Sequence, residues 1–249
     1  GSASDINVNG QTTASWTFRK APKFFDIVTY TGNGVAGRTV AHNLGSVPGA
    51  MMVKATSTTS LWSVYHRSLG PLVNLFLNTT NAIFTSPIYW NNTAPTDAVF
   101  SVGDGSAGNL NNTSGVTYVA YLFAHDAGGF GDDGEQNVIS CGSFTGNGST
   151  TGPVIDLGYE PQWLMVKNTS VAGNWFLMDN MRGIPMTGNT AILKANTADA
   201  EDANQGHAIE LSATGFQVTT SYTGTNGNGN THIYIAIRRP MKTPEAGTE

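Results

Sequence analysis

Short apolar runs separated by polar, glycine-rich stretches form the hydrophobic pattern of this 249-residue chain. The runs are rich in β-branched and aromatic residues, which favour β-strands. They are nearly continuous and follow no heptad spacing, so they do not indicate long helices. The pattern predicts strands at residues 25–30, 50–55, 61–65, 116–123, 163–167, 174–178 and 232–237.

The intervening stretches consist mainly of Asn, Thr, Ser and Gly, and the segment 223–230 is a typical example. Glycine adopts positive φ easily, and Asn, Ser and Thr side chains bond to nearby backbone, so such stretches favour turns over helix. One helix is predicted, at residues 196–205. The fold class predicted is all-β, built from antiparallel, jelly-roll-like β-sandwich units.

The chain also repeats itself, with an offset of 113 to 116 residues. Several short segments of the first half return in the same order in the second. The matched pairs include 31–34 with 145–148, 52–54 with 165–167, 100–102 with 216–218, and 118–121 with 234–237. This self-similarity predicts two tandem, internally duplicated sandwiches.

The predicted boundaries follow from the repeat. They are an N-terminal extension at 1–22, copy one at 23–126, a glycine-rich joint at 127–135, copy two at 136–240 and a tail at 241–249. The Asn-Gly pair inside the repeated Thr-Gly-Asn-Gly segment predicts a tight hairpin turn in each copy. Residues that match between copies are expected to maintain the fold, so specificity is expected where the copies differ.

The net charge of the chain limits the kinds of molecule that it is expected to bind. Lys and Arg number 12 against 17 Asp and Glu, which gives a net charge of −5. No basic stripe is available to neutralise phosphates, so we expect no nucleic-acid partner. No run of 18 apolar residues is present, so we expect no membrane insertion. The single cysteine, Cys141, excludes an internal disulfide and a cysteine-based metal site.

No catalytic signature emerges from the residues. The five histidines, His207 among them, lack metal-binding spacing, and the acidic clusters at 132–135 and 199–202 do not match a calcium loop. No Gly-x-Ser-x-Gly segment occurs. We therefore predict a non-enzymatic protein with no catalytic residue, metal or cofactor, although two carboxylates that meet in space could still hydrolyse a glycoside.

A sugar-binding site is the favoured alternative to catalysis. Sugars present C–H faces and hydroxyls, so their sites combine aromatic rings with planar polar side chains. Copy one holds such a set without a match in copy two: Tyr65, His66, Arg67, Tyr89 and Trp90. The competing interpretation is that Trp90 caps the core or a subunit contact. At the place equivalent to Tyr65–Arg67, copy two carries Asp179, Asn180 and Arg182, and the matched Trp62 and Trp175 are expected to pack against the sandwich.

Five segments carry a resemblance to a known family: 25–34 (FDIVTYTGNG), 62–70 (WSVYHRSLG), 118–126 (YVAYLFAHD), 179–183 (DNMRG) and 234–240 (YIAIRRP). They resemble a duplicated domain of tailed bacteriophages and prophages, whose members are labelled tail fibre or uncharacterised virion surface proteins. The resemblance covers residues 23–249. It implies an extracellular location on the virion surface and, because the chain stops soon after Pro240, a fragment of a longer fibre or spike.

The expected function is a non-enzymatic tail fibre, spike or virion appendage module that binds a bacterial surface polysaccharide. The other expected partners are further virion proteins and two more copies of the chain in a homotrimer, where several weak sites together raise the apparent affinity. The first alternative is a structural virion protein without sugar binding, such as a head decoration, fibre shaft or adaptor. A polysaccharide depolymerase is less favoured, because the short repeats of a parallel β-helix are absent.

Overall fold

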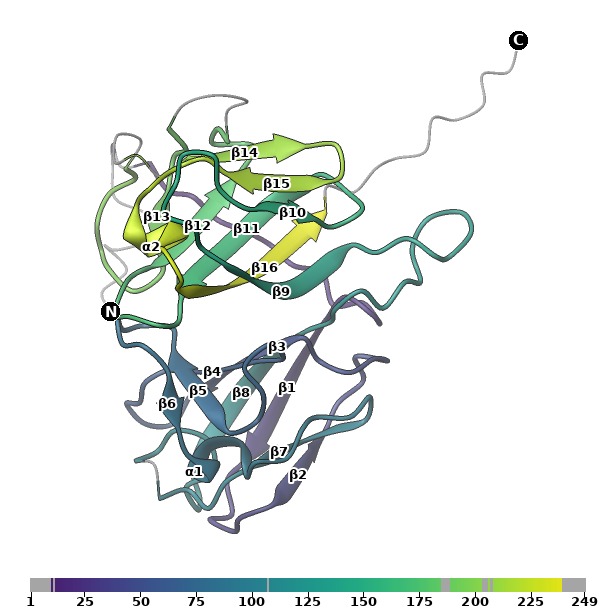
Figure 1. Ribbon diagram of the computed structural model, residues 1–249. Coiled ribbons are helices and arrows are strands. Elements are labelled where there is room, and N and C mark those ends of the chain that lie inside the picture. The colour runs from purple at the N-terminus through teal and green to yellow at the C-terminus, as the bar shows by residue number, and fades with distance from the viewer. Residues whose placement is uncertain are drawn as a thin grey trace.

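The computed structural model describes residues 10, 12–106, 108–184, 189–202, 206 and 208–238. They form two halves, each with one large antiparallel sheet and one smaller sheet (Figure 1). The predicted all-β, sandwich-like class is confirmed. Neither described helix has the length and apolar character needed to span a membrane.

The first half contains a six-stranded sheet, here the first large sheet, with the order β1-β8-β3-β4-β5-β6, and a separate pair of strands, β2-β7. A single helical turn, α1, precedes β7 in the chain. The bounds are β1 Phe25–Thr31, β2 Arg38–Ala41, β3 Ala50–Ala55, β4 Ser63–His66, β5 Val73–Phe76, β6 Phe84–Thr85, α1 Pro87–Trp90, β7 Val99–Val102 and β8 Thr117–Phe123.

The second half contains a five-stranded sheet, here the second large sheet, with the order β13-β12-β11-β16-β9, and a three-stranded sheet, β10-β15-β14. The bounds are β9 Ile139–Thr145, β10 Val154–Asp156, β11 Pro161–Asn168, β12 Trp175–Asp179, β13 Leu193–Lys194, β14 Ile209–Ser212, β15 Gly215–Val218, α2 Thr223–Asn226 and β16 Thr231–Arg238.

All seven predicted strands are present, with ends within two residues of the prediction. The helix predicted at 196–205 is wrong for residues 196–202, which form turns and extended chain. In that segment Asp199 pairs with Lys194 (2.9 Å), and Asp202 forms an isolated bridge with Ile192. Residues 203–205 lie outside the described residues, as does His207.

The two large sheets share one strand order. Across the first large sheet the order is β1-β8-β3-β4-β5, and across the second it is β9-β16-β11-β12-β13, so that the strands correspond one to one in their order along the chain. The pair β2-β7 of the first half corresponds to β10-β15 of the second. This order agrees with a duplication, which stays a prediction. The strand register corrects one matched pair: Thr31 lies opposite Thr117 and Thr145 opposite Thr231, so Tyr118 corresponds to His232 and not to Tyr234.

The predicted tight hairpins at the Thr-Gly-Asn-Gly segments are wrong. A two-residue hairpin would pair β1 with β2, but these strands belong to different sheets, and Asn33 does not have the positive φ that such a turn requires. The chain instead crosses from one sheet to the other at this segment. Strand β9 and strand β10 are related in the same way in the second half.

One buried asparagine in each half holds this crossing. The side-chain oxygen of Asn112 accepts the backbone N–H of Asn33 (3.0 Å), and that of Asn226 accepts the N–H of Asn147 (2.9 Å). Each Asn amide also donates to backbone carbonyls of neighbouring loops, which satisfies polar groups that would otherwise be buried without partners. The two Asn residues therefore join loops that are far apart in the sequence.

The second large sheet is buried on both faces. Val166 and Met178 belong to the core of the second half, between the large and small sheets. The alternate residues Met165, Leu177 and Ile235 belong to the same hydrophobic cluster as the core of the first half. We call the face that carries Met165 and Leu177 the junction face. Burial on both faces explains why residues 163–166 of β11 and 233–237 of β16 are apolar and do not alternate with polar residues.

Buried polar contacts fix the two halves to each other. Trp175 donates its indole N–H to the carbonyl of Phe76 (2.9 Å). The fully buried ammonium of Lys167 donates to the carbonyls of Thr80 (3.1 Å) and Gly173 (2.6 Å). Burial lowers the pKa of Lys167 to about 8. These contacts give the junction a defined register in addition to its apolar packing.

We expect Gly32→Ala to destabilise the fold by about 2–3 kcal/mol. A Cβ at Gly32 would lie 2.2 Å from the carbonyl oxygen of Thr113, so the crossing loop would have to move. The matched control is Gly173→Ala, because a Cβ at Gly173 meets no atom within 4 Å. Urea unfolding of both variants tests this expectation, and equal midpoints would contradict it.

Candidate functional site

The aromatic residues predicted to contact a ligand are buried. Tyr65, Tyr89 and Trp90 are 4%, 7% and 1% exposed, and His66 is 1% exposed. Tyr65 packs edge-on against Trp90, with ring centroids 5.9 Å apart. In the folded chain these rings belong to the hydrophobic core, where they are not exposed for stacking on a sugar. Arg67 is exposed.

A local feature explains this burial. Ser86 caps the single turn α1 by accepting the N–H of Ile88, and Pro87 occupies the first turn. The turn directs Tyr89 and Trp90 inward. Trp62 and Trp175 also pack as predicted, with Trp62 stacked on Tyr121 at 6.0 Å and Trp175 buried.

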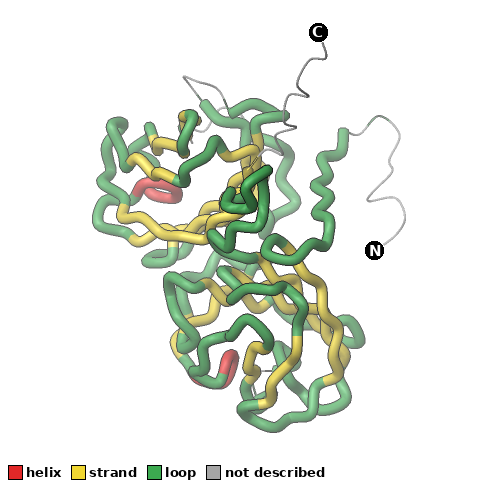
Figure 2. Tube along the Cα trace, turned by 90° about the vertical axis from the view of Figure 1, so that its right-hand side faces the viewer, coloured by secondary structure: helices red, strands yellow, loops and turns green. Residues whose placement is uncertain are grey.

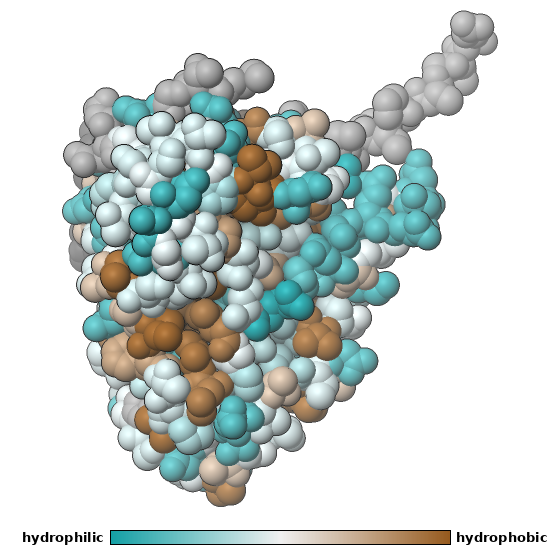
Figure 3. All heavy atoms as spheres, in the orientation of Figure 1, coloured by the Kyte–Doolittle hydropathy of each residue, from teal (hydrophilic) through white to brown (hydrophobic). Residues whose placement is uncertain are grey.

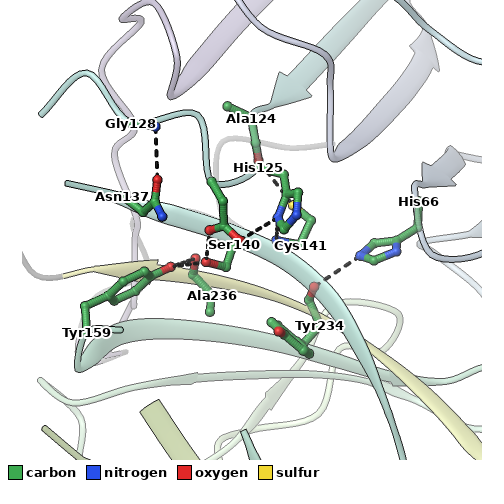
Figure 4. Close-up of polar contacts among 11 residues, drawn as sticks. His66, Ala124, His125, Gly128, Asn137, Ser140, Cys141, Tyr159, Tyr234 and Ala236 are labelled. Carbon is green, nitrogen blue, oxygen red and sulfur yellow. Dashed lines mark hydrogen bonds and ion pairs between the residues drawn. The ribbon is translucent and has the colours of Figure 1, made fainter. Parts of the chain in front are cut away.

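His66 connects the two halves (Figure 4). Its Nδ1 accepts the backbone N–H of Ser68 (3.3 Å), which leaves the ring proton on Nε2, and Nε2 donates to the carbonyl of Tyr234 (3.1 Å). This arrangement requires the neutral ring. Burial lowers the pKa of His66 to about 4. The residue predicted as a ligand contact is thus a structural link between strands β4 and β16.

Next to this link lie a cysteine, a histidine and an aspartate, the residue types of a nucleophilic site. Their geometry does not activate the thiol. His125 Nδ1 accepts the backbone N–H of Cys141 (3.1 Å), while the thiol donates to the carbonyl of Ala124 (3.4 Å). Burial raises the pKa of the Cys141 thiol, so it stays protonated at neutral pH. The Asp126 carboxylate lies 3.3 Å from the same Nδ1.

This group extends into a hydrogen-bonded chain that ties the end of the first half to the second large sheet. Asp126 accepts the hydroxyl of Ser140, and Tyr159 donates to Ser140 Oγ at 2.9 Å and lies 3.1 Å from the carbonyl of Ala236 (Figure 4). Among the described residues, no group of three His, Cys, Asp or Glu side chains can hold a metal ion. The hydrogen bonds of the cluster connect Asp126 with strands β9 and β16.

A cavity of about 600 Å³ is the stronger candidate site. It lies between the N-terminal segment 14–19, Phe24 of the first half, Phe130 of the joint and one end of the junction face. That end carries Trp163, Asp179 and Ile237, on the same face as Met165, Leu177 and Ile235. The volume is within the usual range for ligand sites. The apolar and aromatic residues of its wall are Ala14, Trp16, Phe18, Phe24, Phe130, Val138, Trp163, Met181 and Ile237.

The segment 14–19, which we call the strap, belongs to no sheet and runs as a loop along the side of the second half (Figure 2). Trp16 donates its indole N–H to Asp179 Oδ2 (3.0 Å), and the guanidinium of Arg182 lies 5.2 Å from the centre of the Trp16 ring. Phe18 packs edge-on against Trp163 at 5.6 Å. The strap thus supplies one aromatic wall, opposite the wall formed by the sheet.

An ion pair stands at the edge of this cavity. Asp179 accepts the backbone N–H of Arg182 (2.9 Å) and its Nε–H (2.7 Å) in addition to the indole of Trp16. Burial opposes ionisation of Asp179, but these hydrogen bonds outweigh it and lower its pKa. The side chains of Asp179 and Arg182 are only 6% and 15% exposed, so the pair is fixed.

The sequence analysis identified Asp179 and Arg182, as the counterparts of Tyr65–Arg67, but it missed Trp16 and Phe18. These two residues lie in the N-terminal extension, which has no repeat partner. The signal that could have found them is the alternation of apolar and polar residues at Trp16, Thr17, Phe18 and Arg19, a short amphipathic pattern.

A family model with the description "Domain of unknown function (DUF7483)" matches residues 1–240. The chain belongs to this family. The DUF7483 match includes both halves and also the strap, so the segment that walls the cavity is part of the family's domain. No curated protein and no solved structure gives a significant match to the chain.

Acid should destabilise the fold through His66. Above pH 6.5 neither state is protonated at this ring; as the pH falls from 6.5 towards 4, the unfolded chain binds a proton that the folded chain does not. We expect a loss of about 2 kcal/mol between pH 7 and pH 5. His66→Gln, which keeps a donor for Tyr234, should reduce that loss. Urea unfolding at both pH values checks this, and identical losses would contradict it.

We expect Trp16→Phe to release the strap. The variant keeps a ring beside Arg182 but loses the hydrogen bond to the Asp179 carboxylate, so trypsin cleavage after Arg19 or Lys20 should accelerate by about tenfold. Trp62→Phe is the control, because Trp62 lies on Tyr121 and not on the strap. Mass spectrometry of timed digests measures the rate, and unchanged cleavage would contradict the assigned anchor.

Proposed function

We propose that this protein is a non-enzymatic module of a bacteriophage tail fibre, spike or other virion appendage, and that it binds a bacterial surface glycan in the cavity beneath the strap. The observation that carries the proposal is the combination, in one cavity, of aromatic walls with the polar side chains of Gln162 and Arg238, while the Asp179–Arg182 pair holds the strap in place. The resemblance of the repeated segments to virion surface proteins supports the biological setting.

The cavity has the chemical components that sugar recognition needs. The rings of Trp16 and Phe18 on the strap can lie against sugar C–H faces, while Gln162 and Arg238 are polar side chains of the sheet that line the same cavity. This is the chemistry expected from the sequence for Tyr65–Arg67, at the place where the second half carries its counterpart. A homotrimer would present three such cavities, and linked weak sites raise the apparent affinity by about 10²–10⁴-fold.

An array of bacterial surface polysaccharides tests the proposal. Fluorescently labelled full-length protein should bind a subset of the polysaccharides, and Trp16→Ala should lower the binding at least tenfold. Arg67→Ala is the matched control: Arg67 is exposed but is not part of the cavity wall, so its removal should leave binding unchanged.

Two outcomes of the array would contradict the proposal. One is a folded protein that binds no polysaccharide. The other is a Trp16→Ala variant that binds as well as the parent, which would place the site outside the cavity. Circular dichroism of each variant establishes that it has folded.

A structural role in the virion is the second candidate, and one surface feature favours it. Leu72, Ile83 and Phe84 are exposed near β5 and β6. Figure 3 shows that the visible face of the molecule carries an apolar area at its waist. Exposed apolar areas often mark protein contacts. A stable oligomer in solution, together with an array on which nothing binds, would favour this function over glycan attachment.

A further inference from the structure

The charged groups at the edge of the cavity are already engaged with each other. The Asp179 carboxylate accepts three hydrogen bonds, from Trp16 and from two N–H groups of Arg182. The Arg182 guanidinium also donates to Glu201 (2.8 Å) and to the carbonyl of Leu177 (3.3 Å). This pair holds the strap in place and has little remaining capacity for ligand hydroxyls.

The walls behind this pair are apolar. Trp163 and Ile237 form the sheet side, and both are buried. Phe130 of the joint and Val138, which directly precedes β9, close a second side, and Phe18 of the strap faces Trp163. A ligand hydroxyl directed at these walls would lose its hydrogen bonds to water without gaining new ones, which is unfavourable. A methyl group at the same place would move from water to an apolar surface, which is favourable.

We propose that the cavity selects a sugar residue that carries an apolar substituent, either the methyl group of a 6-deoxy sugar or the methyl group of an acetyl group. The substituent lies against Val138 and Ile237, and the sugar ring lies near Trp16, where Gln162 and Arg238 can reach its hydroxyls. This inference rests on the proposed function and narrows its ligand class. Fully hydroxylated hexoses are the sugars that the cavity rejects.

Two matched pairs of sugars test the selection on the full-length protein by ligand-observed NMR titration. Methyl α-L-rhamnoside is compared with methyl α-L-mannoside, which differs by the 6-hydroxyl, and N-acetylglucosamine with glucose. In at least one pair the deoxy or acetylated sugar should bind at least tenfold more tightly. Equal or weaker binding of these sugars in both pairs overturns the inference, while the proposed function still stands if the polysaccharide array is positive.

An isosteric variant of Val138 tests whether the apolar wall causes the preference for sugars with an apolar substituent. Val138→Thr puts a hydroxyl into the apolar side at constant shape, and it should reduce the ratio of affinities within the selective pair by at least threefold. Val154→Thr is the control, because Val154 is exposed and lies away from the cavity. An unchanged ratio in Val138→Thr overturns the assignment.

The remaining experiment tests whether the cavity is accessible when no sugar binds. The apolar dye 1-anilinonaphthalene-8-sulfonate is used as a probe of the cavity. The third outcome is that none of the four sugars binds, the array is blank and the dye binds in a Trp16-dependent manner, which would show that the cavity is accessible and apolar but takes no sugar. In that case both the inference and the proposed function are wrong.

Discussion

Burial of the second large sheet on both faces is the constraint on which the rest of the structure depends. One face closes the sandwich of the second half, and the other, with Met165 and Leu177, joins the core of the first half. Apolar surface of this extent cannot be left in water, so each half completes the other. Polar groups at the junction, such as His66 and Lys167, are then buried with backbone partners and fix one relative position.

The candidate site is a consequence of the same constraint. Trp163 and Asp179 lie at one end of the junction face, where the N-terminal segment covers the sheet beside Phe24 of the first half. The strap supplies that cover through Trp16 and Phe18, but it lies over the sheet without joining it. The side chains of Trp16 and Phe18 hold the strap over the sheet but do not fill all the space between them. A cavity with an aromatic wall on each side results.

His66 and Asp179 occupy equivalent positions in the two large sheets, but they make different contacts. In the first half His66 binds the neighbouring half through the carbonyl of Tyr234, whereas in the second half Asp179 binds the strap through Trp16. Both side chains lie at the same end of equivalent strands, β4 and β12. At these corresponding places in the two strand orders, the histidine contacts a backbone carbonyl and the aspartate contacts an indole N–H.

The positions of the strands follow from the amino-acid sequence alone. Runs of β-branched and aromatic residues between Gly- and Asn-rich stretches have few other ways to form their backbone hydrogen bonds and bury their side chains. Local pattern could not place Trp90 or Tyr65. An aromatic residue in a polar stretch looks the same whether a capped turn directs it inward, as α1 does, or leaves it in solvent. Nor could it place Trp16 beside Asp179, 163 residues away. The burial of these aromatic residues and the contact between Trp16 and Asp179 depend on which faces of the sheets pack together. A short segment of sequence carries no information about that packing.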